Sequence, residues 1–187
     1  MIRIVIFASG SGTNAENIIN YFKNNENIKV TFVLTNNKNA KVLDRAKRLN
    51  IPSIIFSKNE LKSHNFLTFL ENEADLIILA GFLIKMPDQI VKAFPNKIIN
   101  IHPALLPKYG GKGMYGIHVH NAVVANKETK SGITIHYVNE NYDEGAIIFQ
   151  KEVILSNSDT PEDVAAKIHV LEQENFPKVI ENTILKY

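Results

Sequence analysis

Apolar runs of strand length alternate with segments of helical period over the first hundred residues. The apolar runs cover 2–8, 30–35, 53–56, 75–80 and 97–101, and the amphipathic segments cover 15–23, 40–49, 61–73 and 87–94. This alternation predicts a mostly parallel sheet with helices on both faces. The run DLIILA at 75–80 agrees, because a strand that is covered on both faces is apolar without alternation.

The last third of the sequence follows a different pattern. Ser131 to Val138 and Ala146 to Leu155 have the character of strands, and only 139–145 separates them. This spacing predicts a hairpin that adds an antiparallel pair to one edge of the sheet. The final segment opens with an N-cap and a proline at Thr160-Pro161. It predicts a helix that runs towards Leu185, with a bend or break before Pro177.

These patterns define the expected fold class. The sequence has no internal repeat, low-complexity tract or linker, so we predict a single domain over residues 1–187. The expected class is α/β, with a single doubly wound, mostly parallel Rossmann-like sheet. A C-terminal antiparallel hairpin forms one edge of it, and helices cover both faces.

Composition excludes several classes of protein. The 21 Lys and Arg nearly balance the 19 Asp and Glu, and a net charge of +2 indicates no nucleic-acid partner. The absence of Cys excludes disulfides, zinc–thiolate sites and thiol nucleophiles. The N-terminus lacks the features of a signal peptide, and no apolar run reaches the roughly 20 residues that span a bilayer. We therefore expect a cytoplasmic protein with no membrane partner, and either a monomer or a homodimer.

A glycine-rich turn, Ser9-Gly10-Ser11-Gly12-Thr13-Asn14, joins the first strand to the first helix. Glycines let a ligand approach the backbone, and a helix N-terminus offers amides to an anion, so the turn predicts a phosphate site. The alternative is a tight turn with a Ser or Thr cap. A dinucleotide site is less favoured, because the second strand ends Thr35-Asn36-Asn37-Lys38 without an acid for a ribose. A Walker lysine is absent too, so a single phosphate monoester fits best.

Asn100 and His102 are two residues apart at the end of a predicted strand, so their side chains share a face. Open α/β sheets place their sites at such carboxyl ends. An amide donor and an imidazole donor aimed at one point can stabilise an oxyanion, and His can shuttle a proton. Asp143, in the hairpin loop, is a candidate to orient the imidazole and raise its pKa. The alternatives are a structural Asn, a solvated His and a solvated loop acid.

Five segments together resemble a known family. They are SGSGTN at 9–14, AGFLIKM at 80–86, NIHPALLPKY at 100–109, SGITIHYV at 131–138 and YDEGAIIFQ at 142–150. In this order and spacing the chain is similar, over essentially its whole length, to the phosphoribosylglycinamide formyltransferases of the folate-dependent formyltransferase family. The segment NIHPALLP with a downstream D-x-G is highly specific for folate-dependent formyltransferases. The glycine turn is moderately specific for members that act on a phosphorylated ribose.

The resemblance implies a one-carbon group transferase of purine biosynthesis with small-molecule substrates. A formyl group would pass from 10-formyltetrahydrofolate, the co-substrate, to the amino group of N1-(5-phosphoribosyl)glycinamide. Asn100, His102 and Asp143 match the catalytic residues: the first two would stabilise the tetrahedral intermediate, and Asp143 would tune His102. The match also implies two sets of binding residues. Substrate would bind Gly12, Thr13, Asn14 and Glu172, and folate would bind Leu83, Ile84, Lys85, Met86, Asn100, Asn139, Glu140, Asn141 and Tyr142.

The chain departs from the family pattern in two places. Ile84 stands where the family often has Arg, so a side-chain contact there would be lost or taken over by Lys85. The loop 108–116 is longer and richer in glycine than in the family, and is either a lid over the site or an ordinary connector.

The remaining histidines indicate no metal site, since His118 and His120 lack the i, i+4 spacing of a helical metal pair. His136 lies within a predicted strand. It is either a satisfied strand residue or a support for the catalytic residues.

Three other functions are alternatives to this one. A formyltetrahydrofolate deformylase shares the Asn, His and Asp set, but it normally has an N-terminal regulatory domain that this sequence does not show. Formyltransferases that act on methionyl-tRNA or sugar nucleotides form the second class, and the tRNA enzyme needs a basic surface and an extra C-terminal domain. A Rossmann-type oxidoreductase is the third, and it leaves NIHPALLP unexplained.

Overall fold

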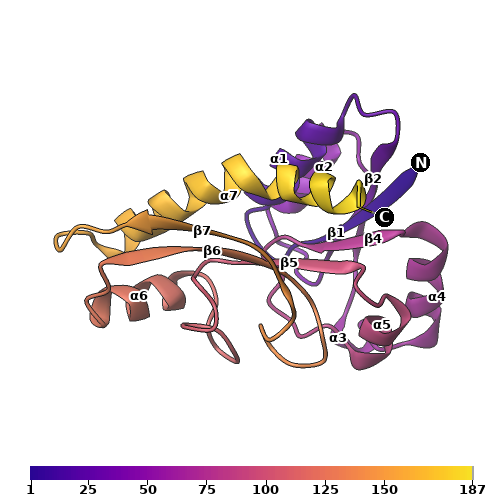
Figure 1. Ribbon diagram of the computed structural model, residues 1–187. Coiled ribbons are helices and arrows are strands. Elements are labelled where there is room, and N and C mark those ends of the chain that lie inside the picture. The colour runs from indigo at the N-terminus through magenta and orange to yellow at the C-terminus, as the bar shows by residue number, and fades with distance from the viewer. Residues whose placement is uncertain (187) are drawn as a thin grey trace. The chain divides into compact units, whose positions relative to one another are not determined.

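The computed structural model describes residues 1–186, which carry seven strands in the order β3-β2-β1-β4-β5-β6-β7 (Figure 1). The sheet is mostly parallel and ends in an antiparallel pair, so the predicted fold class is confirmed. The chain divides into two compact units between Ile99 and Asn100. A single domain over residues 1–187 stays a prediction.

The first unit alternates strands and helices in the predicted rhythm. Its elements are β1 Ile2–Phe7, α1 Thr13–Phe22, β2 Ile28–Thr35, α2 Val42–Arg48, β3 Ser53–Ile55, α3 Lys58–Leu61, α4 His64–Glu73, β4 Leu76–Leu79 and α5 Asp88–Ala93. β1 pairs in parallel with both β2 and β4, and β2 pairs in parallel with β3. β4 is buried along its whole length, as its uninterrupted apolar sequence predicts.

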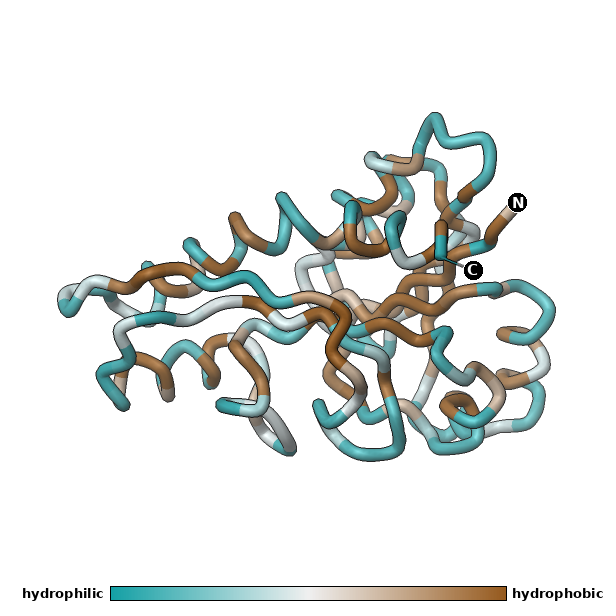
Figure 2. Tube along the Cα trace, in the orientation of Figure 1, coloured by the Kyte–Doolittle hydropathy of each residue, from teal (hydrophilic) through white to brown (hydrophobic). Residues whose placement is uncertain are grey.

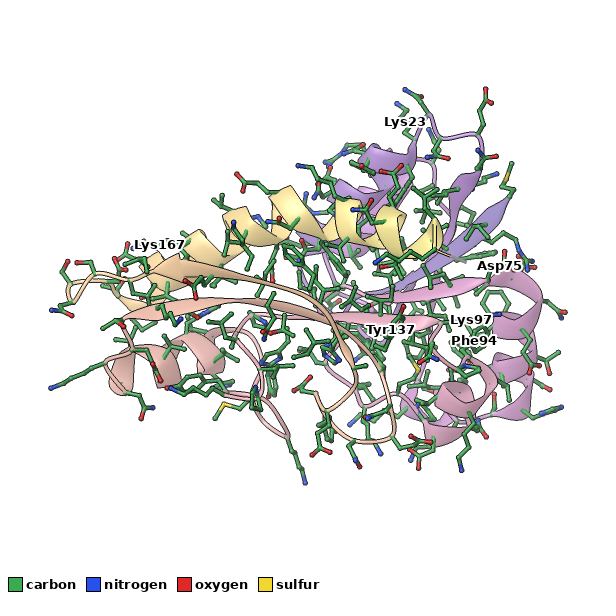
Figure 3. The ribbon with its side chains drawn as sticks, viewed as in Figure 1. Lys23, Asp75, Phe94, Lys97, Tyr137 and Lys167 are labelled. Carbon is green, nitrogen blue, oxygen red and sulfur yellow. The ribbon has the colours of Figure 1, made fainter. Side chains whose placement is uncertain are left out.

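Apolar packing and one ion pair fix the central strands of this unit. Figure 2 shows β1 and β4 as largely hydrophobic. Phe7 at the end of β1 is fully buried, and its ring centroid lies 5.7 Å from that of Phe56 and 5.1 Å from that of Phe82. At the other end, Asp75, labelled in Figure 3, accepts hydrogen bonds from the backbone and the guanidinium of Arg3 at 2.8–3.0 Å. These contacts hold β1 against β4.

The second unit contains the end of β5, followed along the chain by a helix, a β-hairpin and a second helix. Its further elements are α6 Ile117–Ala125, β6 Lys130–Tyr137, β7 Ile147–Ile154 and α7 Pro161–Ile184, while β5 spans Ile98–His102. β6 and β7 pair antiparallel from Lys130↔Ile154 to His136↔Ile147, with a register shift after Ile135. The predicted edge hairpin is therefore confirmed. α7 packs along β6 and β7 (Figure 1), and it also contacts α6.

Two helix predictions need correction. The helix expected over 61–73 begins later, at His64, because Ser63 accepts a hydrogen bond from the Phe66 N–H as its N-cap, and a separate short helix, α3, capped by Ser57, comes before it. The break expected before Pro177 is wrong, since α7 is continuous from Pro161 to Ile184. Phe176 and Ile180 on either side of Pro177 are fully buried, so tertiary packing compensates for the hydrogen bond that proline cannot make.

The hairpin loop before β7 has room only for glycine at position 145. A Cβ built on Gly145 would lie 1.7 Å from the carbonyl oxygen of Tyr137. The backbone of β6 would have to move, and overpacking of this kind costs about 1–3 kcal/mol.

We predict that Gly145→Ala lowers the free energy of unfolding by about 1–3 kcal/mol or more, measured by urea denaturation. Gly10→Ala is the matched control, because no heavy atom lies within 4 Å of its built Cβ. Equal stability of the two variants would contradict the prediction.

Candidate functional site

Asn100 and His102 lie on the last three residues of β5, and their side chains share one face of the strand. Asn100 is half-buried and His102 is 4% exposed. Pro103 follows directly and ends the strand. The sequence therefore predicted the strand and the common face correctly.

Asp143 lies in the loop between β6 and β7, in the left-handed backbone region at φ 55°. Its side chain is 13% exposed, and its Oδ2 accepts a hydrogen bond of 2.8 Å from the Gly111 amide. The same oxygen lies 3.7 Å from Nδ1 of His102. The structure thus brings together two of the predicted catalytic residues and excludes the alternative of a solvated loop acid.

His136 on β6 joins the other oxygen of this carboxylate to Asn100. The imidazole is 2% exposed, and its Nε2 lies 3.1 Å from Nδ2 of Asn100 and 3.7 Å from Oδ1 of Asp143. Its Nδ1 lies 2.8 Å from the carbonyl oxygen of Tyr137, labelled in Figure 3. His136 therefore supports the predicted residues, a role that the sequence left open against that of an ordinary strand histidine.

Backbone carbonyls fix which nitrogen of each imidazole carries the proton. A carbonyl can only accept, so Nδ1 of His136 donates to Tyr137, and its Nε2 accepts from the Asn100 amide. Nε2 of His102 lies 2.7 Å from the carbonyl oxygen of Tyr109 and donates to it. In neutral His102, Nδ1 therefore carries a lone pair, and this lone pair faces Asp143. When His102 is protonated, the new proton lies on Nδ1 and faces the carboxylate.

Burial and charge act in opposite directions on this pair. For His102, burial is the largest effect and lowers the pKa below its usual value of 6.5, although Asp143 and the hydrogen bond to Tyr109 raise it. For Asp143, burial raises the pKa, but the neighbouring imidazoles of His136 and His102 and the hydrogen bond from the Gly111 amide bring it below its usual value of 3.8. The sequence predicted the direction of the Asp143 effect on His102, but not that burial outweighs it.

The loop after β5 is anchored at its beginning by the hairpin. Thr134 Oγ1 donates to the carbonyl of Ala104 at 2.6 Å and accepts from the amide of Leu106 at 3.0 Å. The Tyr109 hydroxyl donates to Glu128 at 2.9 Å, and burial together with this carboxylate raises the pKa of Tyr109 to about 12. These contacts fix the carbonyl that His102 contacts. A lid role for the glycine-rich part of the loop stays a prediction.

The glycine-rich turn lies in the first unit, between β1 and α1. Gly12 is the N-cap of α1 at φ 74°, and no side chain caps the helix, so the alternative of a Ser or Thr cap is wrong. A Cβ on Gly12 would lie 2.4 Å from the Val42 side chain and 2.8 Å from its Cα. Position 12 therefore requires glycine for space as well as for conformation. The first-turn amides of α1 receive no side-chain cap, which suits an anion.

Glu172 lies on α7 with its side chain 15% exposed, and its Oε2 lies 3.6 Å from Nδ1 of His169. Its charge raises the pKa of both His102 and His120, so the three groups belong to one electrostatic neighbourhood of the second unit. His120, on α6, is 6% exposed. The sequence did not single out His120, although its spacing of three from Val123 puts it on the apolar face of the helix.

The segments predicted to bind folate have mixed exposure. In the first unit, the Leu83 side chain is 51% exposed while its amide donates to Ser9 Oγ at 3.1 Å, and Met86 is buried. Lys85, one of the two alternatives for a contact that a family arginine at position 84 would make, is paired with Asp88 at 3.1 Å. In the second unit, Tyr142 is 42% exposed beside three polar loop residues, Asn139, Glu140 and Asn141. Exposed apolar and aromatic groups of this kind can contact a flat ring system.

Residues 1–186 contain neither a metal-binding cluster nor a helix that could cross a membrane. No group of three or more His, Asp or Glu in this part of the chain could hold a metal ion. No helix there has the length and apolar character that crossing a membrane requires.

The chain matches the family model of formyl transferases over residues 2–180, a range that includes parts of both units. Among curated relatives, phosphoribosylglycinamide formyltransferase of Bacillus subtilis (strain 168) is 35% identical over 194 residues, covering 98% of this chain and 95% of that protein. The chloroplastic enzyme of that name from Arabidopsis thaliana is 37% identical over 186 residues, covering 95% of this chain. The chain spans only 64% of the length of the Arabidopsis protein and 60% of its Vigna unguiculata counterpart.

Solved structures agree with the sequence relatives. The crystal structure of phosphoribosylglycinamide formyltransferase from Streptococcus pneumoniae TIGR4 superposes with a TM-score of 0.86 at 32% identity, covering 98% of this chain and 99% of that one. Glycinamide ribonucleotide transformylase 1 from Geobacillus kaustophilus also gives 0.86, at 33% identity and 96% coverage of both chains.

The balance of burial and charge at His102 predicts a specific titration. Because burial lowers its pKa, the imidazole should titrate below 6.5 in an NMR experiment. Asp143→Asn should lower that pKa further, since the carboxylate raises it. Asp159→Asn is the control, because this acid pairs with Lys167, which is labelled in Figure 3, and Asp159 is not among the groups that shift the pKa of His102. A His102 pKa that rises or stays constant in Asp143→Asn would contradict the assignment.

The same shift has a consequence for stability. The unfolded chain binds a proton at His102 near pH 6.5, but the folded chain binds it only at lower pH. The contribution of neutral His102 to the free energy of unfolding is therefore fully present above about pH 6.5. This contribution is lost as the pH falls through the lowered pKa of His102 in the folded protein.

Proposed function

The chain belongs to the formyl transferase family, and from that premise we propose that it transfers a formyl group from 10-formyltetrahydrofolate to the amino group of N1-(5-phosphoribosyl)glycinamide. The observation that carries this proposal is the connected set of Asn100, His102, His136 and Asp143 in the second unit. We propose that both units act together as one formyltransferase domain.

His102 has the properties that a proton shuttle needs. At neutral pH its lowered pKa keeps it uncharged, so it can accept the proton that the substrate amine loses on attack. A proton on Nδ1 would then face Asp143, whose lowered pKa keeps it ionised, at 3.7 Å. The imidazolium can return the proton to the nitrogen of the leaving group. Asp143 thus stabilises the protonated state of His102, while burial keeps the imidazole neutral before the proton arrives.

Asn100 and His102 are proposed to bind the oxygen of the formyl group. When the amine nitrogen bonds to the formyl carbon, an electron pair moves onto this oxygen, and N–H donors stabilise the resulting charge. One hydrogen of Asn100 Nδ2 is directed to His136, which fixes the amide and leaves its second hydrogen for a ligand. Nε2 of His102 already donates to a carbonyl oxygen at 2.7 Å, so its N–H suits an acceptor of that type.

The remaining predicted residues are proposed to hold the two substrates. Gly12, Thr13 and Asn14 would bind the phosphate at the N-terminus of α1, where no side chain caps the helix, and Glu172 would bind the ribose. A folate-bound formyl group supplies the carbon that is transferred. The pterin would lie against 83–86 and 139–142, with Asn100 close to the formyl group.

An assay with both substrates tests the proposal. The protein is incubated with 10-formyltetrahydrofolate and glycinamide ribonucleotide, and the formation of tetrahydrofolate is followed. We expect turnover that requires the ribonucleotide. Turnover without it would indicate a deformylase, and no turnover under either condition would overturn the proposal.

Single substitutions test the two proposed donors. Asn100→Ala and His102→Ala should each reduce kcat by roughly two to three orders of magnitude, which is typical for the loss of an oxyanion donor. Glu152→Gln is a control, since Glu152 pairs with Lys130 on the hairpin and contacts none of these residues. Near-normal kcat in both alanine variants would show that the chemistry takes place elsewhere.

A further inference from the structure

Residues 109–111 contact both ionisable groups of the proposed catalytic set. The carbonyl oxygen of Tyr109 accepts from Nε2 of His102 at 2.7 Å, and the amide of Gly111 donates to Oδ2 of Asp143 at 2.8 Å. Tyr109 has φ 58°, a left-handed conformation that is unfavourable for a residue with a Cβ. A residue keeps such a conformation only where other contacts impose it. The position of the Tyr109 carbonyl therefore depends on what holds this residue in place.

Glu128, which follows α6 along the chain, provides a polar anchor for the Tyr109 side chain. Its Oε1 accepts from the Tyr109 hydroxyl at 2.9 Å and from Nζ of Lys108 at 2.8 Å. The Glu128 side chain is 23% exposed, whereas that of Lys108 is 68% exposed. Burial and the carboxylate raise the pKa of Tyr109 to about 12, so the hydroxyl keeps its proton and remains a donor.

Close packing does not enclose the Tyr109 side chain on every side. The residue is half-buried and borders a hollow of about 300 Å³, which the apolar side chains of Leu105, Pro107 and Val123 also line. A side chain that faces a hollow lacks contacts on that side, so packing alone does not fix its position. The hydrogen bond to Glu128 is therefore the directional contact that sets where the Tyr109 side chain lies.

We propose that Glu128 is a positioning residue for the transfer reaction: through the Tyr109 hydroxyl it holds the Tyr109 carbonyl oxygen against Nε2 of His102, and it thereby keeps neutral His102 in the tautomer that carries its proton on Nε2. The polar contacts of Glu128 are with Lys108 and Tyr109, so it acts on His102 through position and not by contact. The effect on turnover rests on the proposed function, whereas the effect on the tautomer rests on the geometry alone.

Loss of the Tyr109 carbonyl would favour the other tautomer of His102. A neutral imidazole has one N–H, and its hydrogen-bond partners decide which nitrogen carries it. Nδ1 faces Oδ2 of Asp143 at 3.7 Å, so a carboxylate would stabilise a proton there once the carbonyl is displaced. The Nε2–H donor proposed for the formyl oxygen would then be lost. The charge of Glu128 is not the cause, because Glu128 is not among the groups that shift the pKa of His102.

The nitrogen chemical shifts of labelled histidine, measured by NMR on the full chain without substrates, test this link where His102 is neutral. The His102 signals are identified by their loss in His102→Ala. Glu128→Ala and Tyr109→Phe should each move most of neutral His102 to the Nδ1–H tautomer. Glu128→Gln keeps an acceptor oxygen for the hydroxyl and should retain the Nε2–H tautomer. Lys108→Met is the matched control, because it removes the other partner of the same carboxylate oxygen and leaves the Tyr109 hydroxyl its acceptor.

Steady-state kinetics provide a second readout. Glu128→Ala and Tyr109→Phe should each lower kcat about 10- to 100-fold and leave KM for both substrates within about threefold, because a donor is misplaced while the binding residues are unchanged. Glu128→Gln and Lys108→Met should keep kcat within about threefold of the unaltered protein. The double variant with Tyr109→Phe and Glu128→Ala should be no slower than either single variant, since both changes remove the same hydrogen bond.

Two results would overturn the inference. One is a His102 that keeps the Nε2–H tautomer in both Glu128→Ala and Tyr109→Phe, and the other is an equal loss of kcat in Lys108→Met. The tautomer is measured without substrates, which separates this inference from the proposed function. A tautomer change in a protein without turnover would reject formyl transfer but support the link from Glu128 to His102. An unchanged tautomer in an active enzyme would reject that link alone.

Discussion

The buried carboxylate of Asp143 is the group on which the geometry of the second unit depends. Its two oxygens face two different histidines, each at 3.7 Å, and one of them also accepts the Gly111 amide at 2.8 Å. Taking a carboxylate out of water costs several kcal/mol unless polar groups compensate. The loop after β5 supplies part of this compensation through the Gly111 amide. Displacing that loop would remove the one hydrogen bond that the described residues are shown to donate to the carboxylate.

The two histidines around this carboxylate have opposite tautomers, and the backbone selects them. Tyr137 accepts from Nδ1 of His136, whereas Tyr109 accepts from Nε2 of His102. His136 consequently accepts from Asn100 and fixes an amide, while His102 directs an empty lone pair to Asp143. Identical side chains thus carry their protons on different nitrogens because different carbonyl oxygens hold them, and this difference is what suits only His102 to the proposed proton transfer.

The sequence predicted those features of the fold and of the candidate site that depend on residues close together in the chain. Continuous apolar runs located the strands, and the two-residue spacing of Asn100 and His102 placed them on one face. Gly10 and Gly12 marked the turn before α1, although the cap at Gly12 and the close approach of Val42 became visible only in the fold. A local signal can also mislead. Pro177 predicted a bend or break, but the helix continues through it, because Phe176 and Ile180 on either side are buried.

Long-range and electrostatic features could not be predicted from the sequence. Nothing in the spacing of Asp143 from His102 shows that the hairpin loop folds back onto β5, because that contact depends on the register of β6 and β7 and on the tight turn at Gly145. The net pKa of His102 likewise requires its burial to be known, since Asp143 and desolvation act in opposite directions. The hydrogen bond between Tyr109 and Glu128 also joins two segments that no local pattern brings together.

Burial lowers the pKa of His102 by more than Asp143 raises it, and this net effect bears directly on the proposed chemistry. A histidine that Asp143 kept protonated could donate to an oxyanion, but it could not accept a proton from an attacking amine. A histidine without Asp143 would be neutral, but its protonated state would be buried without a partner. The observed arrangement avoids both limits, because His102 is neutral at rest and gains an ion-pair partner when it is charged. Burial and the acid are therefore both required for a group that must accept and return one proton.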